Sequence, residues 1–160
     1  MIAANRNTPE ADGVVRVSRT LSAAPETVFD AWVNPEKLQR WWAGEQRIVR
    51  IHDLDVRVGG AWRISFDTPE GNHFEMQGVY HEVTPPARLS FSWSAARNGE
   101  SGTSSMVVVE FVPAESGTLL TIAHHLPPDA PDAASVQPGW ESSLNRLTRL
   151  IDANGEQAND

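Results

Sequence analysis

The side chain with the clearest capacity for acid–base chemistry is His124. It lies in the segment TLLTIAHH, residues 118–125, whose alternation predicts a strand with His124 on the same face as Leu120 and Ile122. A neutral imidazole in apolar surroundings can accept or donate a proton near pH 7. No carboxylate is predicted on that face, so a buried, hydrogen-bonded histidine is the favoured interpretation. An orienting contact to a ligand and a role in catalysis are the alternatives.

Three other polar residues, His73, Glu75 and His81, share one face of a predicted strand and could suggest a metal site. The rise of a strand places His81 about 20 Å beyond Glu75, whereas zinc needs all its ligands within about 2.0–2.2 Å of one point. We therefore expect a solvated outer face, with no metal and no cofactor. The chain has no cysteine, which removes thiolate and disulfide chemistry, and no serine nucleophile paired with a base is evident.

Composition and charge indicate one globular domain. The chain has 160 residues, of which 40% are hydrophobic and 21% charged, and its net charge is −8. This charge argues against nucleic-acid and anionic-membrane partners, because both need a basic face. Without a membrane-length apolar run, a signal-like start or a cysteine, a cytoplasmic protein is expected. We predict a single domain at residues 13–153 with flexible tails at residues 1–12 and 154–160.

Hydrophobic periodicity predicts the elements that must position these residues. Period-two alternation indicates a strand at Val14–Leu21, interrupted by Arg19, and six more strands after residue 47 joined by short turns. Between the first strand and the rest, Pro25 and the Asn34–Pro35 pair mark the starts of two short helices.

The second half of the chain contains a polar loop and the longest predicted helix. The run RNGESGTSS, residues 97–105, is predicted to be a hairpin loop, and residues 127–137 a proline-rich connector. Residues 138–155 then form an amphipathic helix that Gly155 is expected to end. The predicted fold class is α+β: a curved seven-stranded antiparallel sheet wrapped around the C-terminal helix, with an internal space that the two short helices close.

Two adjacent tryptophans end the second short helix, in NPEKLQRWW. Neighbours on a helix lie about 100° apart, so Trp41 and Trp42 cannot both face the same wall of the core. The spacing from Leu38 favours Trp41 as the structural residue and Trp42 as a partial lid that borders the opening of the internal space.

Five segments in register resemble the START-like or birch-pollen-allergen-like superfamily, SRPBCC. They are APETVFDAWVNPEKLQRWW, DVRVGGAWRISF, GVYHEVTPPARLSFSW, TLLTIAH and GWESSLNRL. The branch they resemble is the bacterial domain related to the C-terminal half of the activator of heat-shock protein 90 ATPase. The resemblance implies a helix-grip fold around an apolar cavity that takes sterols, lipids, polyketides or hormones, and in a minority of members cyclase or dehydratase activity. It implies no chaperone activation, because the separate domain that contacts the chaperone has no room in this sequence.

We therefore predict that the chain binds a small hydrophobic or aromatic molecule, of the lipid, sterol or polyketide class, in an internal cavity. The alternatives are a cyclase or dehydratase that uses His124 as its acid–base group, and an interaction or co-chaperone-like module with a filled interior. A homodimer is possible. The predicted cavity wall is aromatic for the most part and consists of Trp42, Trp62, Phe66, Phe74, Met76, Phe91, Trp93, His124, Trp140 and Leu144.

Overall fold

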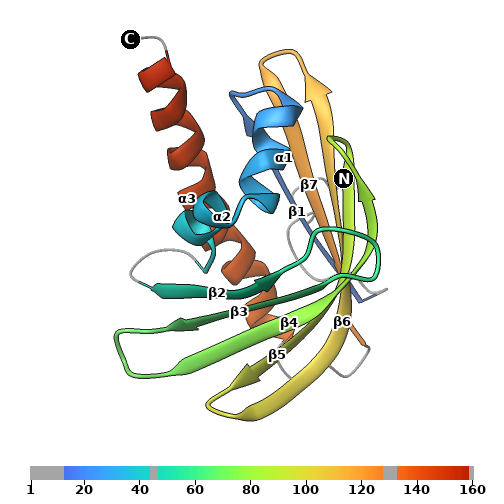
Figure 1. Ribbon diagram of the computed structural model, residues 1–160, viewed down its shortest axis with the longest axis vertical. Helices are drawn as coiled ribbons and strands as arrows, with labels where there is room; N and C mark the ends of the chain where they lie inside the picture. The colour runs from blue at the N-terminus through green and yellow to red at the C-terminus, as the bar shows by residue number, and fades with distance from the viewer. Residues whose placement is uncertain (1–12, 44–46, 128–132, 159–160) are drawn as a thin grey trace.

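The computed structural model describes residues 13–43, 47–127 and 133–158, and these form one sheet and three helices (Figure 1). The predicted tail at residues 1–12 lies outside the described residues. The elements in chain order are β1 (Val14–Leu21), α1 (Pro25–Val33), α2 (Pro35–Trp41), β2 (Ile48–Leu54), β3 (Ala61–Asp67), β4 (His73–Thr84), β5 (Arg88–Arg97), β6 (Glu100–Ala114), β7 (Gly117–His125) and α3 (Ala133–Ala158).

The seven strands make one antiparallel sheet in the order β1-β7-β6-β5-β4-β3-β2. From β2 to β7, strands that are neighbours in the sheet also follow one another along the chain. The last strand, β7, then pairs with the first, β1. Figure 1 shows the sheet curving beside α3, with α1 between α3 and the long strands β6 and β7. The predicted α+β architecture, a curved sheet around a C-terminal helix, is confirmed.

The two short helices begin where their sequence signals predict. Pro25 and Pro35 occupy the first turns of α1 and α2, where a missing N–H costs no hydrogen bond. The Asn34 side chain caps α2 by accepting a hydrogen bond from the Glu36 backbone N–H at 3.0 Å. Helix α1 packs on the sheet through Phe29, whose ring centroid lies 5.2 Å from that of Phe111 in β6. Both helices therefore lie on the face of the sheet that α3 also covers.

Arg19 explains the imperfect alternation of β1. Its side chain lies on the same face as the buried residues Val15 and Val17, and it reaches across to α3. There the guanidinium donates to the Asn145 amide oxygen at 2.7 Å and forms an ion pair with Glu141. The polar residue in the apolar stripe thus ties the edge strand to the C-terminal helix.

Two predicted boundaries are wrong. The polar run at residues 97–105 is not a loop: β5 and β6 meet in a turn at Asn98 and Gly99, both with positive φ, and β6 begins at Glu100. Its serine and threonine residues do not show an apolar alternation, but cross-strand pairing such as Trp93 with Ser105 makes them part of the ladder.

Helix α3 is also longer than predicted at both ends. It begins at Ala133 inside the expected connector, contains Pro138, and passes through Gly155 to Ala158. Val136 is partly buried against the core and extends the apolar stripe ahead of Trp140, which favours the helix in spite of the proline. A single glycine in a helix costs only about 1 kcal/mol relative to alanine, so Gly155 alone does not end it.

Candidate functional site

All six tryptophans of the chain meet in one cluster between the sheet and α3. Trp42 is its centre, with ring centroids 5.8 Å from Trp41, 6.0 Å from Trp62, 5.5 Å from Trp93 and 5.9 Å from Trp140. These neighbours come from α2, β3, β5 and α3, so the cluster joins every layer of the fold. Aromatic pairs at such distances add about 0.5–1.5 kcal/mol each beyond the burial of their area.

Trp32 of α1 completes the cluster from the other side. Its ring lies 4.7 Å from Trp41 and 6.0 Å from Trp140, and stacks on the latter at 29°. The periodicity of α1 places this residue on the buried face with Val28 and Phe29, as the helix pattern predicts. Trp32 is not among the predicted wall residues, although the apolar stripe of α1 contained the signal.

The adjacent pair Trp41 and Trp42 divides into two structural roles. Trp41 is fully buried, and its indole N–H donates to the Ala31 carbonyl oxygen at 2.9 Å, so it fixes α2 to α1. Trp42 ends the helix in an extended backbone conformation (φ −62°, ψ 140°), which turns its side chain into the interior. It is only 5% exposed. Trp42 therefore fills the internal space instead of bordering its opening.

The remaining space beside Trp42 is a cavity of about 20 Å³. That volume holds one water molecule. Its lining comes from both short helices and from four strands of the sheet: Trp32, Leu38, Trp42, Leu54, Trp62, Ile64, Tyr80, Leu89 and Phe91. The aromatic rings around this cavity pack on one another and leave almost no free volume.

The predicted wall residues fall into three groups. Trp42, Trp62 and Phe91 line the 20 Å³ cavity. Four others are buried in the adjoining core, or partly so, without lining it: Met76, Trp93, Trp140 and Leu144. The remaining pair, Phe66 and Phe74, stack on each other at 4.9 Å between β3 and β4 and are only partly buried.

His124 is buried at the edge of the cluster, with both ring nitrogens engaged. The Trp140 indole N–H donates to Nδ1 at 3.0 Å, so Nδ1 must be the acceptor and the proton of the neutral ring lies on Nε2. Nε2–H donates to the Ser105 hydroxyl oxygen at 2.7 Å, and that hydroxyl donates in turn to the Trp93 carbonyl oxygen at 3.4 Å. This chain of hydrogen bonds links α3, β7, β6 and β5.

Burial is the main cause that lowers the pKa of His124 to about 3, with a smaller contribution from the neighbouring charge of His125. The imidazole is therefore neutral at pH 7, and protonation of Nδ1 would break the hydrogen bond from Trp140. A ring with no free nitrogen and a strongly lowered pKa is poorly suited to proton transfer. The favoured interpretation from the sequence, a buried and hydrogen-bonded histidine, describes this geometry.

A glycine in β4 allows the Trp62 side chain to lie directly against the neighbouring strands. The Trp62 indole N–H passes over Gly78 in β4 and donates to the Ser92 carbonyl oxygen in β5 at 3.2 Å. A Cβ atom at Gly78 would lie 1.9 Å from that oxygen and 2.7 Å from Trp62 Nε1. Only glycine leaves room for this contact. Gly78 thus positions one wall of the tryptophan cluster.

Among the buried polar side-chain atoms described, Trp32 Nε1 stands apart because it has no hydrogen-bond partner. Tyr80 lines the same small cavity, and burial raises the pKa of its phenol, which keeps it protonated at pH 7. Four of the lining residues, Trp32, Trp42, Trp62 and Tyr80, carry a hydrogen-bond donor, and the Trp62 donor is already paired with Ser92.

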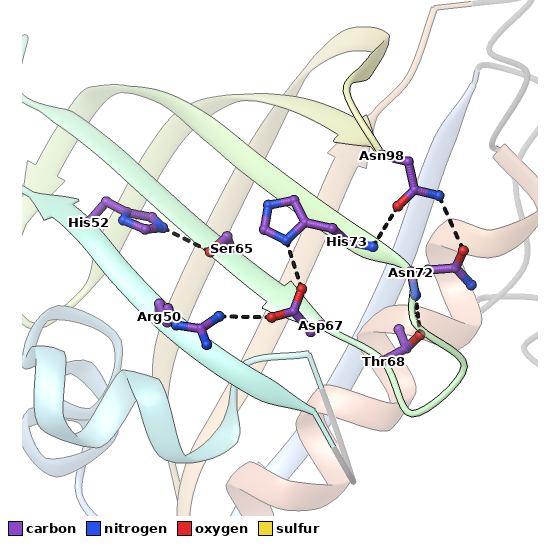
Figure 2. Close-up of polar contacts among 8 residues, drawn as sticks. All are labelled: Arg50, His52, Ser65, Asp67, Thr68, Asn72, His73 and Asn98. Atoms are coloured by element: carbon purple, nitrogen blue, oxygen red, sulfur yellow. Dashed lines mark hydrogen bonds and ion pairs between the residues drawn. The ribbon is translucent and has the colours of Figure 1, made fainter.

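The outer face of the sheet is polar and its charged groups pair with one another. Figure 2 shows Asp67 between Arg50 at 2.8 Å and His73 at 2.7 Å, hydrogen bonds that lower the pKa of Asp67. Glu75 binds Arg63 at 2.6 Å on the same face. Within the described residues no group of three or more histidine, aspartate or glutamate side chains could hold a metal ion, and no helix is long and apolar enough to cross a membrane.

A wider depression of about 400 Å³ lies over β3, β4 and β5, lined mostly by residues that face away from α3. Arg63 and Asp53 contribute its charges, and they pair with each other at 3.3 Å. It is open, and most of its lining surface is apolar.

Comparison with known proteins is consistent with this architecture. The family model of the Activator of Hsp90 ATPase homolog 1-like proteins matches residues 22–152. Among solved structures, the AHSA1 protein from Silicibacter pomeroyi is similar at 29% identity with a TM-score of 0.77, covering 88% of this chain and 99% of that one. A protein from Chromobacterium violaceum is 28% identical with a TM-score of 0.76, covering 87% of this chain and 97% of that one. No curated protein matches the sequence.

The family match extends from the end of β1 to the last turns of α3, and so includes all six tryptophans, the Ser105–His124 pair and Gly78. The chain therefore belongs to the family of Activator of Hsp90 ATPase homolog 1-like proteins, within the START-like superfamily.

Proposed function

We propose that the protein binds a small, flat hydrophobic molecule between the sheet and α3, at the position that the Trp42 indole occupies in this structure. The fold to which the chain belongs commonly binds hydrophobic ligands. The observation that carries the proposal is the surrounding of Trp42: four other tryptophans from four different elements enclose one bicyclic ring. A site that holds an indole so completely is also complementary to a ligand of the same shape.

The way in which the Trp42 side chain is held supports the idea that a ligand can displace it. Trp41, Trp62 and Trp140 each donate their indole N–H to a protein acceptor, whereas Trp42 is held by its ring contacts. Its backbone has already left the helix, and the next residue, Ala43, has a left-handed φ of 70°. A rotation about this short segment would move the indole out of the interior without unfolding α2.

The size of the vacated space sets the class of ligand. Cavities of about 150 Å³ inside proteins bind benzene, so removal of a larger indole makes room for a flat molecule of two fused rings. Rings stack on rings with a gain that linear acyl chains do not share. Of the predicted classes, this favours aromatic polyketide-like molecules over sterols and simple lipids.

The test is native mass spectrometry of the protein purified without added ligand, followed by titration of tryptophan fluorescence with flat hydrophobic compounds. We expect a co-purified mass or saturable quenching that is weaker in Trp93→Ala, because Trp93 would contact the bound ring. No bound mass and no quenching for any compound would overturn the proposal.

A second candidate function, an interaction module for a protein partner or a second copy of the chain, is favoured by the filled interior. A cavity of about 20 Å³ is what a packed core leaves behind. β1 and β2 are the outer strands of the sheet, and either offers an edge for pairing. Sedimentation of the purified chain and capture of partners, carried out in parallel with the ligand titration, separate the two functions.

Catalysis by His124 is the less suitable candidate, because its hydrogen bonds and lowered pKa both oppose proton transfer. We place the protein in the cytoplasm, in keeping with a chain that contains no cysteine.

A further inference from the structure

The unpartnered N–H of Trp32 is an exception in this interior. Trp32 is only 3% exposed, and its Nε1 is the one buried side-chain nitrogen or oxygen without a hydrogen bond among the described residues. Buried donors are almost always paired, because an unpaired donor loses its hydrogen bonds to water and gains nothing in return. Three other indoles of the same cluster have protein acceptors. An acceptor for Trp32 is therefore missing among the described residues.

The place where that acceptor could sit is the 20 Å³ cavity that Trp32 lines together with Trp42. The lining side chains offer aliphatic groups, aromatic rings and donors. Their only side-chain oxygen is the hydroxyl of Tyr80, which could accept as well as donate, but it forms no hydrogen bond with Trp32 Nε1. The cavity has room for one acceptor atom. It also lies beside the indole that the proposed ligand would replace.

We propose that the Trp32 indole N–H is the polar anchor of the ligand site and donates a hydrogen bond to an acceptor atom on the edge of the bound molecule. This inference rests on the proposed function, and it narrows the ligand to a flat aromatic molecule with an in-plane acceptor, such as a ring nitrogen or a ketone or quinone oxygen. Plain hydrocarbons would fit the rings but leave the donor unpaired.

The expected selectivity follows from that unpaired donor. A site built to form a buried hydrogen bond discriminates against an analogue that lacks the partner atom, since the protein group then stays unsatisfied. For one neutral hydrogen bond the net gain corresponds to about tenfold in affinity.

Naphthalene and its aza-analogues quinoline and isoquinoline test the inference, because all three match an indole in size and differ in one ring atom. Their dissociation constants are measured by tryptophan quenching on the wild-type chain and on Trp32→Phe. We expect Trp32→Phe to weaken at least one aza-analogue about tenfold more than it weakens naphthalene. Using each compound as its own reference removes differences in water solubility. Trp93→Phe is the matched control and is expected to weaken all three compounds equally.

A spectroscopic readout needs only the wild-type chain and remains available if Trp32→Phe fails to fold. In a ¹H–¹⁵N spectrum, the resonance of the Trp32 indole proton is expected to move downfield when quinoline or isoquinoline binds and not when naphthalene binds. The inference is overturned if naphthalene and both analogues bind wild type but lose affinity equally in Trp32→Phe. It is also overturned if all three bind and none shifts the Trp32 indole proton. In either case the proposed function stands. If none of the three binds wild type, the proposed function fails as well.

Discussion

The indole N–H of Trp140 donates to Nδ1 of His124 at 3.0 Å, so a residue of the C-terminal helix and a residue of β7 are joined by a buried hydrogen bond across the interior. This bond selects the tautomer of His124 and orients Nε2–H toward Ser105. Its two partners are 16 residues apart in the chain. The contact fixes the position of α3 relative to the sheet, at the end of the helix where the tryptophan cluster lies.

Replacement of Trp140 by phenylalanine removes this donor and leaves Nδ1 of His124 buried without a partner. We expect Trp140→Phe to lower the free energy of unfolding by about 1–3 kcal/mol more than ring shrinkage alone does. Urea denaturation measures the change, with Trp42→Phe as the control because it also shortens a buried indole but leaves His124 untouched. Equal losses in the two variants would show that the hydrogen bond contributes nothing.

The lowered pKa of His124 makes stability depend on pH in a defined window. In the unfolded chain the imidazole titrates near 6.5, whereas the folded value is about 3, so between these pH values the unfolded state binds the extra proton. Stability therefore falls as the pH drops from about 6.5 toward 3, by at most about 1.4 kcal/mol per pH unit from this group.

The measurement is denaturant unfolding at pH 6.5 and pH 4.5 for wild type and His124→Gln. We expect wild type to lose about 2 kcal/mol more than the variant over this interval. The exposed His81 provides the control, since His81→Gln should follow wild type. A pH dependence in His124→Gln identical to that of wild type would contradict the prediction.

Removal of the central indole should create a cavity that a small ring can fill. Trp42→Ala is expected to cost about 3–5 kcal/mol of stability. Addition of free indole should then raise the melting temperature of the variant more than that of wild type, because the variant offers the space without displacement of a side chain. Val58→Ala, at a position 68% exposed, is the control with no expected cavity. A variant that gains nothing from indole would mean that its neighbours collapse into the space.

The close approach of Trp62 to Ser92 depends on Gly78. A Cβ atom there meets the Ser92 backbone, which cannot move aside as a side chain can, so we expect Gly78→Ala to destabilise the fold by about 2 kcal/mol or more. Gly139 in α3 is the matched control. A Cβ atom there meets nothing within 4 Å, and Gly139→Ala should stabilise the helix by about 0.5–1 kcal/mol. In thermal unfolding, the melting temperature should fall in Gly78→Ala and rise in Gly139→Ala, relative to wild type.

Much of the architecture could be predicted because it depends on local pattern. Alternation in the strand segments and the Asn34–Pro35 start of α2 are properties of a few consecutive residues, and β1, α1 and α2 begin where these signals lie. The wrong boundaries have non-local causes. Residues 100–105 become strand because β5 pairs with them, and α3 continues past Pro138 and Gly155 while its apolar stripe packs on the core.

By itself the sequence determined the fold class, the order of elements and an interior rich in aromatic rings, because hydrophobic periodicity and caps act along the chain. Only the tertiary structure decided that Trp42 fills the interior and that His124 is held between Trp140 and Ser105. It also decided that Trp32 Nε1 is the one buried polar side-chain atom of the described residues without a hydrogen-bond partner. These outcomes depend on groups brought together from α1, α2, α3 and four strands. Packing and hydrogen bonding between such distant segments have no signature in the spacing of residues.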